Sequence, residues 1–422
     1  MFVEFSVENF KSIKDRQYLL LEADAIGTKT ANTFGVKAPR KFQLLKSLVI
    51  YGANASGKTN VIAAISNMHD FILNSTDLKN GQLIKWYLPF KFDKRTRHAA
   101  TQFSVKFIGP ESVLYHYEFC YDQHEIIFES LDFYPRGYKA NLFRREQGEL
   151  AKLGNHFSDK KIDRRILKNQ LFLSKMGNSG HDQMGAVYMY FRTMMLWSIP
   201  AKSQLKYLME KTQKMYIDEQ GQHFRQKLNS LMRVADTKIE GVVVSKREFT
   251  ADEFGFLEDE REFTRYRTLA IHKIYDNGEE VGTEAIDIKE ESVGTQVLFA
   301  LGGMILNKLN HGGVLVIDEM DNSLHPQLSK FLVELFHNPE SNPHNAQLIF
   351  ATHETALLEG GVFRNDQVCI VQKNDKGASE VINSTQFDEL KADVSLYQYY
   401  MRGQMGGQPR IREVEFIYGN DL

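Results

Sequence analysis

Hydrophobic positions at the start of the chain follow the two-residue period of a β-strand. Val3, Phe5 and Val7 recur in this way, with polar residues between them. Because strand side chains alternate between the two faces of a sheet, the pattern predicts a hairpin at a sheet edge over residues 1–20. Residues 22–45 are rich in glycine, threonine, alanine and lysine, and we predict a loop there.

A strand, a turn and a helix follow between residues 47 and 75. Residues 47–51 are an apolar run of strand length. After Thr59, apolar residues recur at the three- and four-residue spacing of one helix face. They are Val61, Ile62, Ile65, Met68, Phe71 and Ile72. Three further strand patterns, separated by short turns, predict an antiparallel sheet; they span residues 102–108, 113–121 and 125–134.

Helical periodicity dominates residues 158–235. Three groups of apolar residues each share one face of a predicted helix: Ile162, Ile166 and Leu167; Tyr188, Phe191 and Met195; and Phe224, Leu228, Leu231 and Met232. The apolar stretch 184–200 contains Arg192 and is too short to span a bilayer, so we predict a buried helix. The charged segment 246–265 is predicted to be a loop or an arm.

Strand and helix patterns alternate again from about residue 266, which predicts the second half of the same α/β domain. We therefore predict an N-terminal part at 1–155, a helical insertion at 156–245, a C-terminal part at 246–383 and a tail at 384–422. A chain of 422 residues has room for one large or two modest domains.

The composition is that of a globular protein, with 42% hydrophobic and 25% charged residues. A net charge of −2 gives no general attraction to nucleic acid, so DNA binding would need a local basic patch. Two clusters are candidates: Lys160, Lys161, Arg164, Arg165 and Lys168, and Arg144 with Arg145. The two cysteines are too few for a disulfide framework, and acidic residues interrupt any signal peptide. We expect a cytoplasmic protein without membrane attachment.

The turn between the first predicted strand and helix reads Gly52-Ala53-Asn54-Ala55-Ser56-Gly57-Lys58-Thr59. It matches the phosphate-binding motif G-x-x-x-x-G-K-[ST] in full. Strand, glycine-containing loop and helix N-terminus direct backbone N–H groups and a positive helix end towards a phosphate. The sequence therefore predicts a phosphate-binding loop (P-loop).

Two later strand patterns end in residues suited to phosphate chemistry. Residues 312–317 lead into Asp318 and Glu319, and residues 347–352 lead into His353. Ligands of open α/β sheets bind at strand ends, where Asp318 could hold Mg²⁺ and Glu319 could activate a water. His353 could reach a γ-phosphate through its ring N–H.

Ser292, Val293, Gly294 and Thr295 begin another helical pattern. Ser292 is a typical N-cap, and a helix N-terminus of this kind can also bind a phosphate. From this segment alone, an ordinary cap and a phosphate site both stay open.

These motifs together resemble the ABC-type ATPases of the SMC, RecF and OLD branch, over residues 1–75 and 285–375. The segment Asn9-Phe10-Lys11-Ser12-Ile13 is similar to the N-F-[KR]-S-[FI] opening of that branch. Residues 52–60 resemble its Walker A motif, including Asn54 and ending in Asn60. The other matches are Ser292 to Thr295 (signature), Asp318-Glu319 (Walker B), residues 322–326 (D-loop) and His353 (switch histidine).

Within this branch, the chain is most similar to small bacterial AAA-type ATPases of phage-defence operons, which include subunits of abortive-infection and PARIS-like systems. Two segments carry the resemblance: Glu291-Ser292-x-Gly294-Thr295-Gln296 and Tyr400-x-x-Gly403-x-x-Gly406-Gly407-x-Pro409.

The resemblance implies an α/β fold, an ABC-type P-loop nucleotide-binding domain with an antiparallel side sheet and a helical insertion. It implies ATP and Mg²⁺ as cofactors, slow hydrolysis, Glu319, His353 and Lys58 as catalytic residues, and Thr59 and Asp318 at the metal. The implied nucleotide-binding residues are Gly52, Ala53, Asn54, Ala55, Ser56, Gly57, Lys58, Thr59, Asn60, Lys11, Ser12, Ser292 and Gly294. In the family, the signature completes the site of a second subunit, which implies a head-to-tail dimer or a higher oligomer.

The chain departs from the branch at several positions. The signature reads Ser-Val-Gly-Thr in place of Ser-Gly-Gly-Gln, which argues against fast cooperative turnover, and His325 stands at the usual D-loop aspartate. Gln102 is the best candidate for the Q-loop glutamine. About 45 residues follow the last predicted strand, too few for the metal-binding Toprim domain of an OLD nuclease.

Three functions compete at this point. The first is a sensor ATPase of an anti-phage system that holds or activates a separate effector, such as a nuclease. The second is a DNA-repair ATPase similar to RecF, which clamps duplex DNA. The third, an ABC subunit coupled to a transporter, should show a standard signature and a clear Q-loop.

Overall fold

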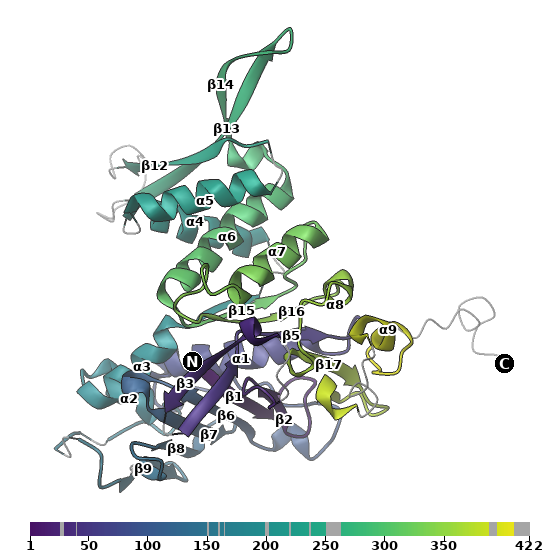
Figure 1. The fold of residues 1–422 in the computed structure, drawn as a ribbon. Helices are drawn as coiled ribbons and strands as arrows, with labels where there is room; N and C mark the ends of the chain where they lie inside the picture. Colours follow the sequence, from purple (N-terminus) through teal and green to yellow (C-terminus); the bar gives the residue numbers. More distant parts are fainter. Residues whose placement is uncertain are drawn as a thin grey trace. The chain divides into compact units, whose positions relative to one another are not determined.

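The computed structural model describes residues 1–25, 29–38, 40–149, 152–158, 161–163, 165–198, 202–218, 221–235, 238–249, 263–387 and 395–408. The chain forms two compact units (Figure 1). The first unit comprises Met1–Ser198, Gly313–Glu319 and Val333–Leu422, and the second comprises Ile199–Gly312 and Met320–Leu332. None of the helices in these described parts has both the length and the apolar character needed to cross a membrane.

A six-stranded sheet forms the centre of the first unit. Its strands, in spatial order, are β11 (Met195–Ser198), β15 (Val314–Asp318), β16 (Gln347–Ala351), β5 (Ser47–Tyr51), β17 (Val368–Lys373) and β18 (Ser379–Asn383). All neighbouring pairs are parallel except β17 and β18. The side chains of β5, β15 and β16 are buried throughout, as expected for inner strands of a parallel sheet.

A seven-stranded antiparallel sheet makes up a second layer of this unit. It contains, in spatial order, β10 (Lys152–Leu153), β9 (Ala140–Glu146), β8 (Ile126–Phe133), β7 (Leu114–Tyr121), β6 (Thr101–Ile108), β1 (Phe2–Glu8) and β2 (Gln17–Leu20). The predicted N-terminal hairpin at the sheet edge and the three predicted strands after residue 100 are therefore confirmed.

Helix α1 (Lys58–Asn74) contributes to the core that joins the two sheets. All six apolar residues that predicted this helix are at most 1% exposed. Burial of each such side chain contributes about 1.5–3 kcal/mol. Phe71 stacks on Trp86 at a ring distance of 4.6 Å and meets Phe119 and Tyr121 edge-on. This packing fixes the helix that begins at the P-loop lysine.

The remaining elements of the first unit surround these layers. They are the hairpin β3 (Thr33–Ala38) and β4 (Arg40–Leu45), and helices α2 (Phe172–Asn178), α3 (Asp182–Thr193), α8 (Ala356–Glu359) and α9 (Leu396–Met401). Helix α7 (Pro326–His337) begins in the second unit and ends in the first.

The second unit packs helices against a three-stranded antiparallel sheet. Its helices are α4 (Lys202–Asp218), α5 (Gly221–Val234) and α6 (Val293–His311), and its strands are β12 (Gly241–Phe249), β13 (Phe263–Asp276) and β14 (Glu279–Asp287). The β13–β14 hairpin extends past β12 and α5 (Figure 1). Its turn uses Asn277 and Gly278, both in the left-handed region that a tight hairpin of this kind requires.

Four sequence predictions are wrong in local structure. Residues 33–45 form the β3–β4 hairpin and are not a loop. Ile162, Ile166 and Leu167 lie outside any helix, and Met195 belongs to strand β11, since α3 ends at Thr193. Of the segment 246–265, predicted to be a loop or an arm, residues 246–249 and 263–265 are paired ends of β12 and β13 and so are not a loop, while residues 250–262 lie outside the described residues.

A buried histidine makes the stability of the first unit depend on pH. The His337 ring nitrogen Nε2 lies 2.8 Å from Ser47 Oγ, and burial together with Lys46 and Lys29 lowers the pKa of His337 from 6.5 to about 3. The folded state therefore keeps this ring neutral, whereas the unfolded chain takes up a proton below pH 6.5.

We expect acid to destabilise the protein through His337. Above pH 6.5, His337 should have no effect on the free energy of unfolding. Between pH 6.5 and pH 3, His337 should lower the free energy of unfolding by about 1.4 kcal/mol for each pH unit of acidification. Thermal unfolding between pH 7 and pH 5 should show a shallower loss for His337→Gln than for wild type. The exposed His98→Gln serves as a control, and equal slopes in all three proteins would contradict the role of His337.

Candidate nucleotide-binding site

Three neighbouring parallel strands place the predicted chemical residues at one edge of the central sheet. Strand β16 lies between β15 and β5, with Ile317 opposite Phe350 and Ala351 opposite Ile50. All three strands run in the same direction, so their carboxyl ends meet at one edge. The P-loop follows β5, the Walker B carboxylates end β15, and His353 follows β16. The structure therefore brings together motifs that are separated by up to 300 residues in the chain.

The two P-loop glycines lie in close contact with residues of neighbouring elements. Gly52 has φ +155° and Gly57 has φ +115°. A Cβ added to Gly52 would lie 2.3 Å from the Val371 carbonyl oxygen. A Cβ added to Gly57 would lie 2.1 Å from Ser379 Oγ. Both positions exclude a side chain by space as well as by backbone conformation.

Lys58 is buried at the first turn of α1 and its ammonium group faces the loop. The Nζ atom donates hydrogen bonds to the carbonyl oxygens of Gly52, at 2.7 Å, and Ala53, at 3.1 Å. It also lies 3.5 Å from His353 Nδ1. A positive charge is thus held inside the loop, where it can neutralise a bound phosphate.

The Walker B residues meet the P-loop through Thr59. The Thr59 side chain hydrogen bonds to the Asp318 carboxylate, which is 1% exposed. Burial raises the pKa of Asp318, while the Thr59 hydrogen bond and Lys58 oppose this effect. Glu319 is only half-buried and has a left-handed backbone with φ +51°. Non-glycine residues in this region cost energy and occur preferentially at functional sites.

Two buried oxygen atoms at this site show that it suits a phosphate and a cation. Ser56 Oγ and Asp318 Oδ1 have no hydrogen-bond partner within the described residues. A hydroxyl in the P-loop can donate to a phosphate oxygen, and a buried carboxylate oxygen can bind Mg²⁺ or its water ligands. The residues present therefore fit ATP with Mg²⁺.

The N-terminal motif at residues 9–13 contacts the P-loop through the side chain of Ser12. Asn60 Nδ2 donates to Ser12 Oγ at 2.8 Å. Ser379 Oγ lies 2.8 Å from Ser12 Oγ and 2.7 Å from the Ser56 carbonyl oxygen, within hydrogen-bonding distance of both. Lys11 is exposed, and its Nζ lies 5.7 Å from the Phe10 ring centroid. Ser12 and Asn60 thus lie at the loop.

Asn9 and Gln102 have other partners. The Asn9 side chain donates to the carbonyl oxygens of Thr96 and Ala99 and accepts from the Phe90 N–H, so it holds the segment before β6. Gln102, the candidate Q-loop residue, lies within β6 and donates to Glu118.

His353 is exposed and sits on an ordered turn after β16. The Glu354 N–H donates to Thr352 Oγ1 at 2.9 Å, and the Tyr51 hydroxyl donates to the Glu354 carbonyl oxygen at 3.0 Å. These bonds join the His353 turn to the strand that leads into the P-loop.

Ser292 and Gly294 belong to the second unit, at the start of α6. Ser292 Oγ accepts the Thr295 N–H at 3.1 Å, which confirms the N-cap. Gly294 is close to the D-loop segment, since a Cβ added there would lie 2.7 Å from the Ser323 carbonyl oxygen. Both Ser292 and Val293 are exposed. The helix start is therefore accessible to a second molecule.

The basic clusters of the sequence are largely neutralised. Arg145 is buried against Glu129 and donates to the carbonyl oxygens of Gln170 and Leu167. Arg144 pairs with Glu146 at 2.7 Å. In the cluster at residues 160–168, Arg165 pairs with Asp163 and Lys168 with Glu125, while Lys160 and Arg164 lie outside the described residues.

Sequence reasoning missed two groups that contact the P-loop. Ser379 begins β18 and contacts the loop from behind. The segment 395–408 lies beside Gly52, since a Cβ added to Gly407 would lie 3.4 Å from Gly52 Cα. Ser379 carries no motif of its own. The segment 395–408 contains the glycine-rich motif noted in the sequence, but that motif did not predict a contact with the P-loop; its glycines Gly403, Gly406 and Gly407 signal a turn with close backbone contacts.

Residues 47–359 match the family described as "AAA domain, putative AbiEii toxin, Type IV TA system". The chain belongs to this family. The matched segment contains the P-loop, Ser292, the Walker B carboxylates and His353. Together with the two sheets, the match confirms the predicted α/β fold class with a P-loop domain and an antiparallel side sheet. The protein is a P-loop ATPase domain for which ATP is the fitting ligand.

Several solved structures are similar over nearly the whole chain. A Smc head domain with an extended coiled coil, bound to the C-terminal domain of ScpA and derived from Pyrococcus furiosus, is 13% identical, with 96% of this chain and 98% of that chain covered and a TM-score of 0.42. The recombination mediator protein RecF is 14% identical, with 90% of this chain and 98% of that chain covered and a TM-score of 0.37. The structure of cbiO1 from Clostridium perfringens is 10% identical, with 99% of this chain and 99% of that chain covered and a TM-score of 0.34. No curated protein matches the chain.

Proposed function

We propose that the protein is a slow, Mg²⁺-dependent ATP hydrolase. The observation that carries this proposal is the meeting of four side chains at one sheet edge: Lys58 inside the P-loop, Asp318 bonded to Thr59, Glu319 beside it, and His353 at 3.5 Å from Lys58. These are the groups that phosphoryl transfer from ATP to water needs, because it depends on positioning and on charge neutralisation.

Each residue has a distinct role in this proposal. The backbone N–H groups from Gly52 to Thr59 and the Lys58 ammonium bind the β- and γ-phosphates. Glu319 accepts a proton from the attacking water, whose oxygen bonds to the γ-phosphorus while the bond to the β–γ bridging oxygen breaks. ADP and phosphate are the products. His353 donates a hydrogen bond to a γ-phosphate oxygen.

Thr59 and Asp318 are the residues that would hold Mg²⁺. The bound cation neutralises part of the phosphate charge. Asp318 is suited to this role because its buried Oδ1 has no hydrogen-bond partner among the described residues. Burial raises its pKa, and a nearby cation would oppose this effect by favouring the charged form.

We further propose that two copies associate head to tail. Ser292 and Gly294 stand at an exposed helix start in the unit that does not contain the P-loop. In this arrangement they bind the γ-phosphate held by the P-loop of the other copy, and each nucleotide lies between two subunits.

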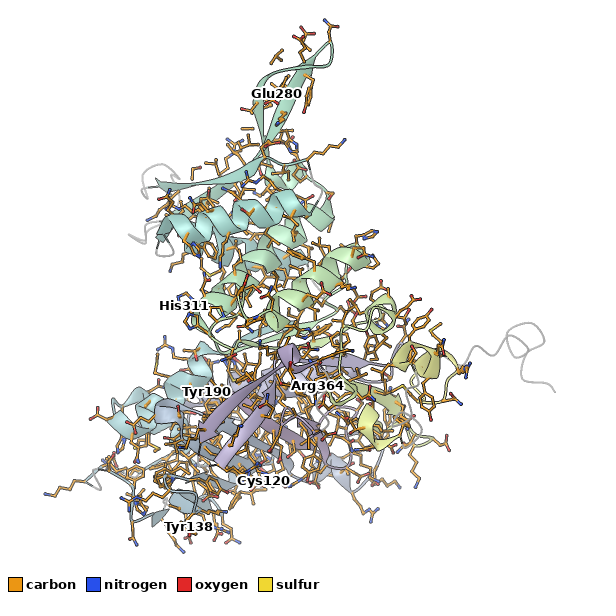
Figure 2. The ribbon with its side chains drawn as sticks, viewed as in Figure 1. Cys120, Tyr138, Tyr190, Glu280, His311 and Arg364 are labelled. Carbon is orange, nitrogen blue, oxygen red and sulfur yellow. The ribbon has the colours of Figure 1, made fainter. Side chains whose placement is uncertain are left out.

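We also propose that the ATPase serves as the sensor or regulator of an anti-phage system and acts on a separate effector, such as a nuclease. The family description, which names an AbiEii toxin and a toxin–antitoxin system, supports this role. The effector's docking surface lies on the second unit. There the β13–β14 hairpin exposes Ile274, Tyr275 and Val281, with Glu280 beside them (Figure 2). The tail is a poorer surface, because Tyr399, Tyr400 and Met405 are buried.

When this protein is co-expressed with the neighbouring gene, the two products should form a complex, and their affinity for each other should depend on ATP. A shift of about 1–3 kcal/mol between nucleotide states corresponds to roughly 5- to 150-fold in binding. Pull-down with and without Mg²⁺-ATP measures this shift, and Lys58→Ala should abolish it. The double variant Tyr275→Ser with Val281→Ser should weaken the complex and leave ATPase activity unchanged. If no neighbouring product binds in any state, or if the pure protein cleaves nucleic acid itself, the sensor role is wrong.

A DNA clamp is the alternative function, and one observation favours it. A hollow of about 420 Å³ on the β3–β4 hairpin is lined by Gly35, Val36, Lys37, Arg40 and Lys41. Arg40 pairs with Glu22 at 2.7 Å, but Lys37 and Lys41 at the same hollow can attract a polyanion. ATP-dependent, salt-sensitive binding of a fluorescent DNA duplex, lost in Lys37→Glu with Lys41→Glu, would favour the clamp over the sensor.

A further inference from the structure

Residues 395–408, which we call the strap, pack against the P-loop strand. The strap contains helix α9 and the glycine turn that follows it. Leu396, Tyr399, Tyr400 and Met405 are buried. The turn closes on itself, because the Tyr400 hydroxyl donates to the Gly407 carbonyl oxygen at 3.2 Å and Gln408 Nε2 donates to the Tyr400 carbonyl oxygen at 2.7 Å.

The glycine turn touches the first glycine of the P-loop. A Cβ added to Gly407 would lie 3.4 Å from Gly52 Cα and 2.7 Å from Ile370 Cγ2. A Cβ added to Gly406 would lie 2.2 Å from Gln372 Oε1 on the same strand, β17. The strap therefore packs against β17 as closely as glycine allows, and its backbone lies within van der Waals reach of the start of the P-loop.

Tyr400 links the strap to a second part of the nucleotide site. Its ring packs on Tyr51, the last residue of β5, at a centroid distance of 5.7 Å. The Tyr51 hydroxyl in turn donates to the Glu354 carbonyl oxygen, next to His353. One aromatic pair thus contacts both the strand that leads into the P-loop and the turn that presents the switch histidine.

We propose that Tyr400 and Gly407 are positioning residues for nucleotide binding, and that the strap holds Gly52 and the His353 turn in the conformation that accepts the phosphates. This inference rests on the proposed ATP site. Gly52 carries one of the two carbonyl oxygens that bind Lys58 Nζ, so a displaced Gly52 also displaces the lysine. Because coupling between sites is reciprocal, bound nucleotide stabilises the docked strap.

The chain offers a matched pair of glycines for the test. Gly403 and Gly407 have φ +71° and +73°, so alanine meets the same backbone penalty at both. A Cβ at Gly403 meets only Gln408 Oε1, at 4.0 Å, far from the P-loop. Any difference between Gly407→Ala and Gly403→Ala therefore reports the contact with Gly52 and Ile370.

Titration with a fluorescent ATP analogue and Mg²⁺ measures the effect. Gly407→Ala should bind about tenfold more weakly than Gly403→Ala, with the KM for ATP raised by a larger factor than kcat is lowered and with the same thermal unfolding temperature without nucleotide. Tyr400→Phe, which keeps the ring on Tyr51, should bind nearly as wild type, and Tyr400→Ala should bind weakly.

Hydrogen exchange of the wild-type protein gives an independent measurement. Amides of residues 395–408 should exchange more slowly with a non-hydrolysable ATP analogue, and Lys58→Ala should show no such change. Equal affinities for the two glycine variants, or unchanged exchange in the strap while wild type binds nucleotide, would overturn the positioning role alone. If wild type and Lys58→Ala bind nucleotide equally poorly, the ATP site itself is wrong and the inference fails with it.

Discussion

Glu319→Gln is expected to slow ATP hydrolysis by about 100-fold or more while ATP and Mg²⁺ still bind. Glu319 stands at the end of β15, next to the carboxylate that is bonded to Thr59, and it is only half-buried, so water can reach it. The amide of glutamine has nearly the same shape and can orient a water, but it cannot accept the proton. The substitution should therefore slow hydrolysis without weakening ATP binding.

Phosphate release under saturating Mg²⁺-ATP measures turnover, and equilibrium titration measures binding. Glu354→Gln is a matched control, because it makes the same chemical change beside His353, where Glu354 accepts the Ala356 N–H at the start of a short helix. Glu319→Gln should also accumulate as a nucleotide-bound dimer in size-exclusion chromatography. Turnover equal to that of Glu354→Gln would remove Glu319 from its catalytic role.

The backbone of Glu319 adds a physical reason for this assignment. A left-handed conformation disfavours any residue with a Cβ, and costs about 1–2 kcal/mol. Glycine would relieve the strain but would remove the carboxylate. A strained glutamate at the end of a buried strand is therefore better explained by the function of its side chain than by local stability.

The site residues that could be predicted from the sequence are those that lie in short, local sequence patterns. Strand β5 was predicted from a continuous apolar run, helix α1 from the three- and four-residue spacing of its apolar residues, and the P-loop between them from a motif of eight residues. Asp318, Glu319 and His353 were placed correctly at strand ends because each follows a continuous apolar run. These three residues lie close together because β15 and β16 are neighbouring parallel strands, whose carboxyl ends meet at one edge of the sheet.

The missed elements depend on partners far along the chain. Strand β11 follows α3 after one residue and pairs with β15 over 100 residues away, so its apolar residues continued the helical pattern of Tyr188 and Phe191. The β3–β4 hairpin buries Phe34 and Phe42, but lysines and a glycine between them obscured the alternation. Ser379 contacts the P-loop residue Ser56 across 323 residues of chain, and the strap contacts Gly52 across a similar distance, so no local pattern reveals either contact.

The second large effect concerns the proposed composite site. Ser292→Arg should abolish ATPase activity while ATP still binds at the P-loop of the same chain. The arginine side chain is much larger than the serine hydroxyl, and its bulk at an exposed helix start blocks the approach of a second copy. Loss of the N-cap costs only about 1 kcal/mol, so the fold should persist. Ser292→Thr, which keeps the hydroxyl and the cap, should retain activity.

Mixing Ser292→Arg with Lys58→Ala chains should restore activity, although each variant alone is inactive. A mixed dimer pairs the intact P-loop of one chain with the intact Ser292 of the other, which rebuilds one of its two sites. Random pairing at equal amounts makes about half of the dimers mixed, so about a quarter of wild-type activity is expected if the sites act independently. Two different affinity tags allow mixed dimers to be isolated and assayed. Isolated mixed dimers without activity would refute the shared site, because the two lesions would then act within each chain and not across the interface.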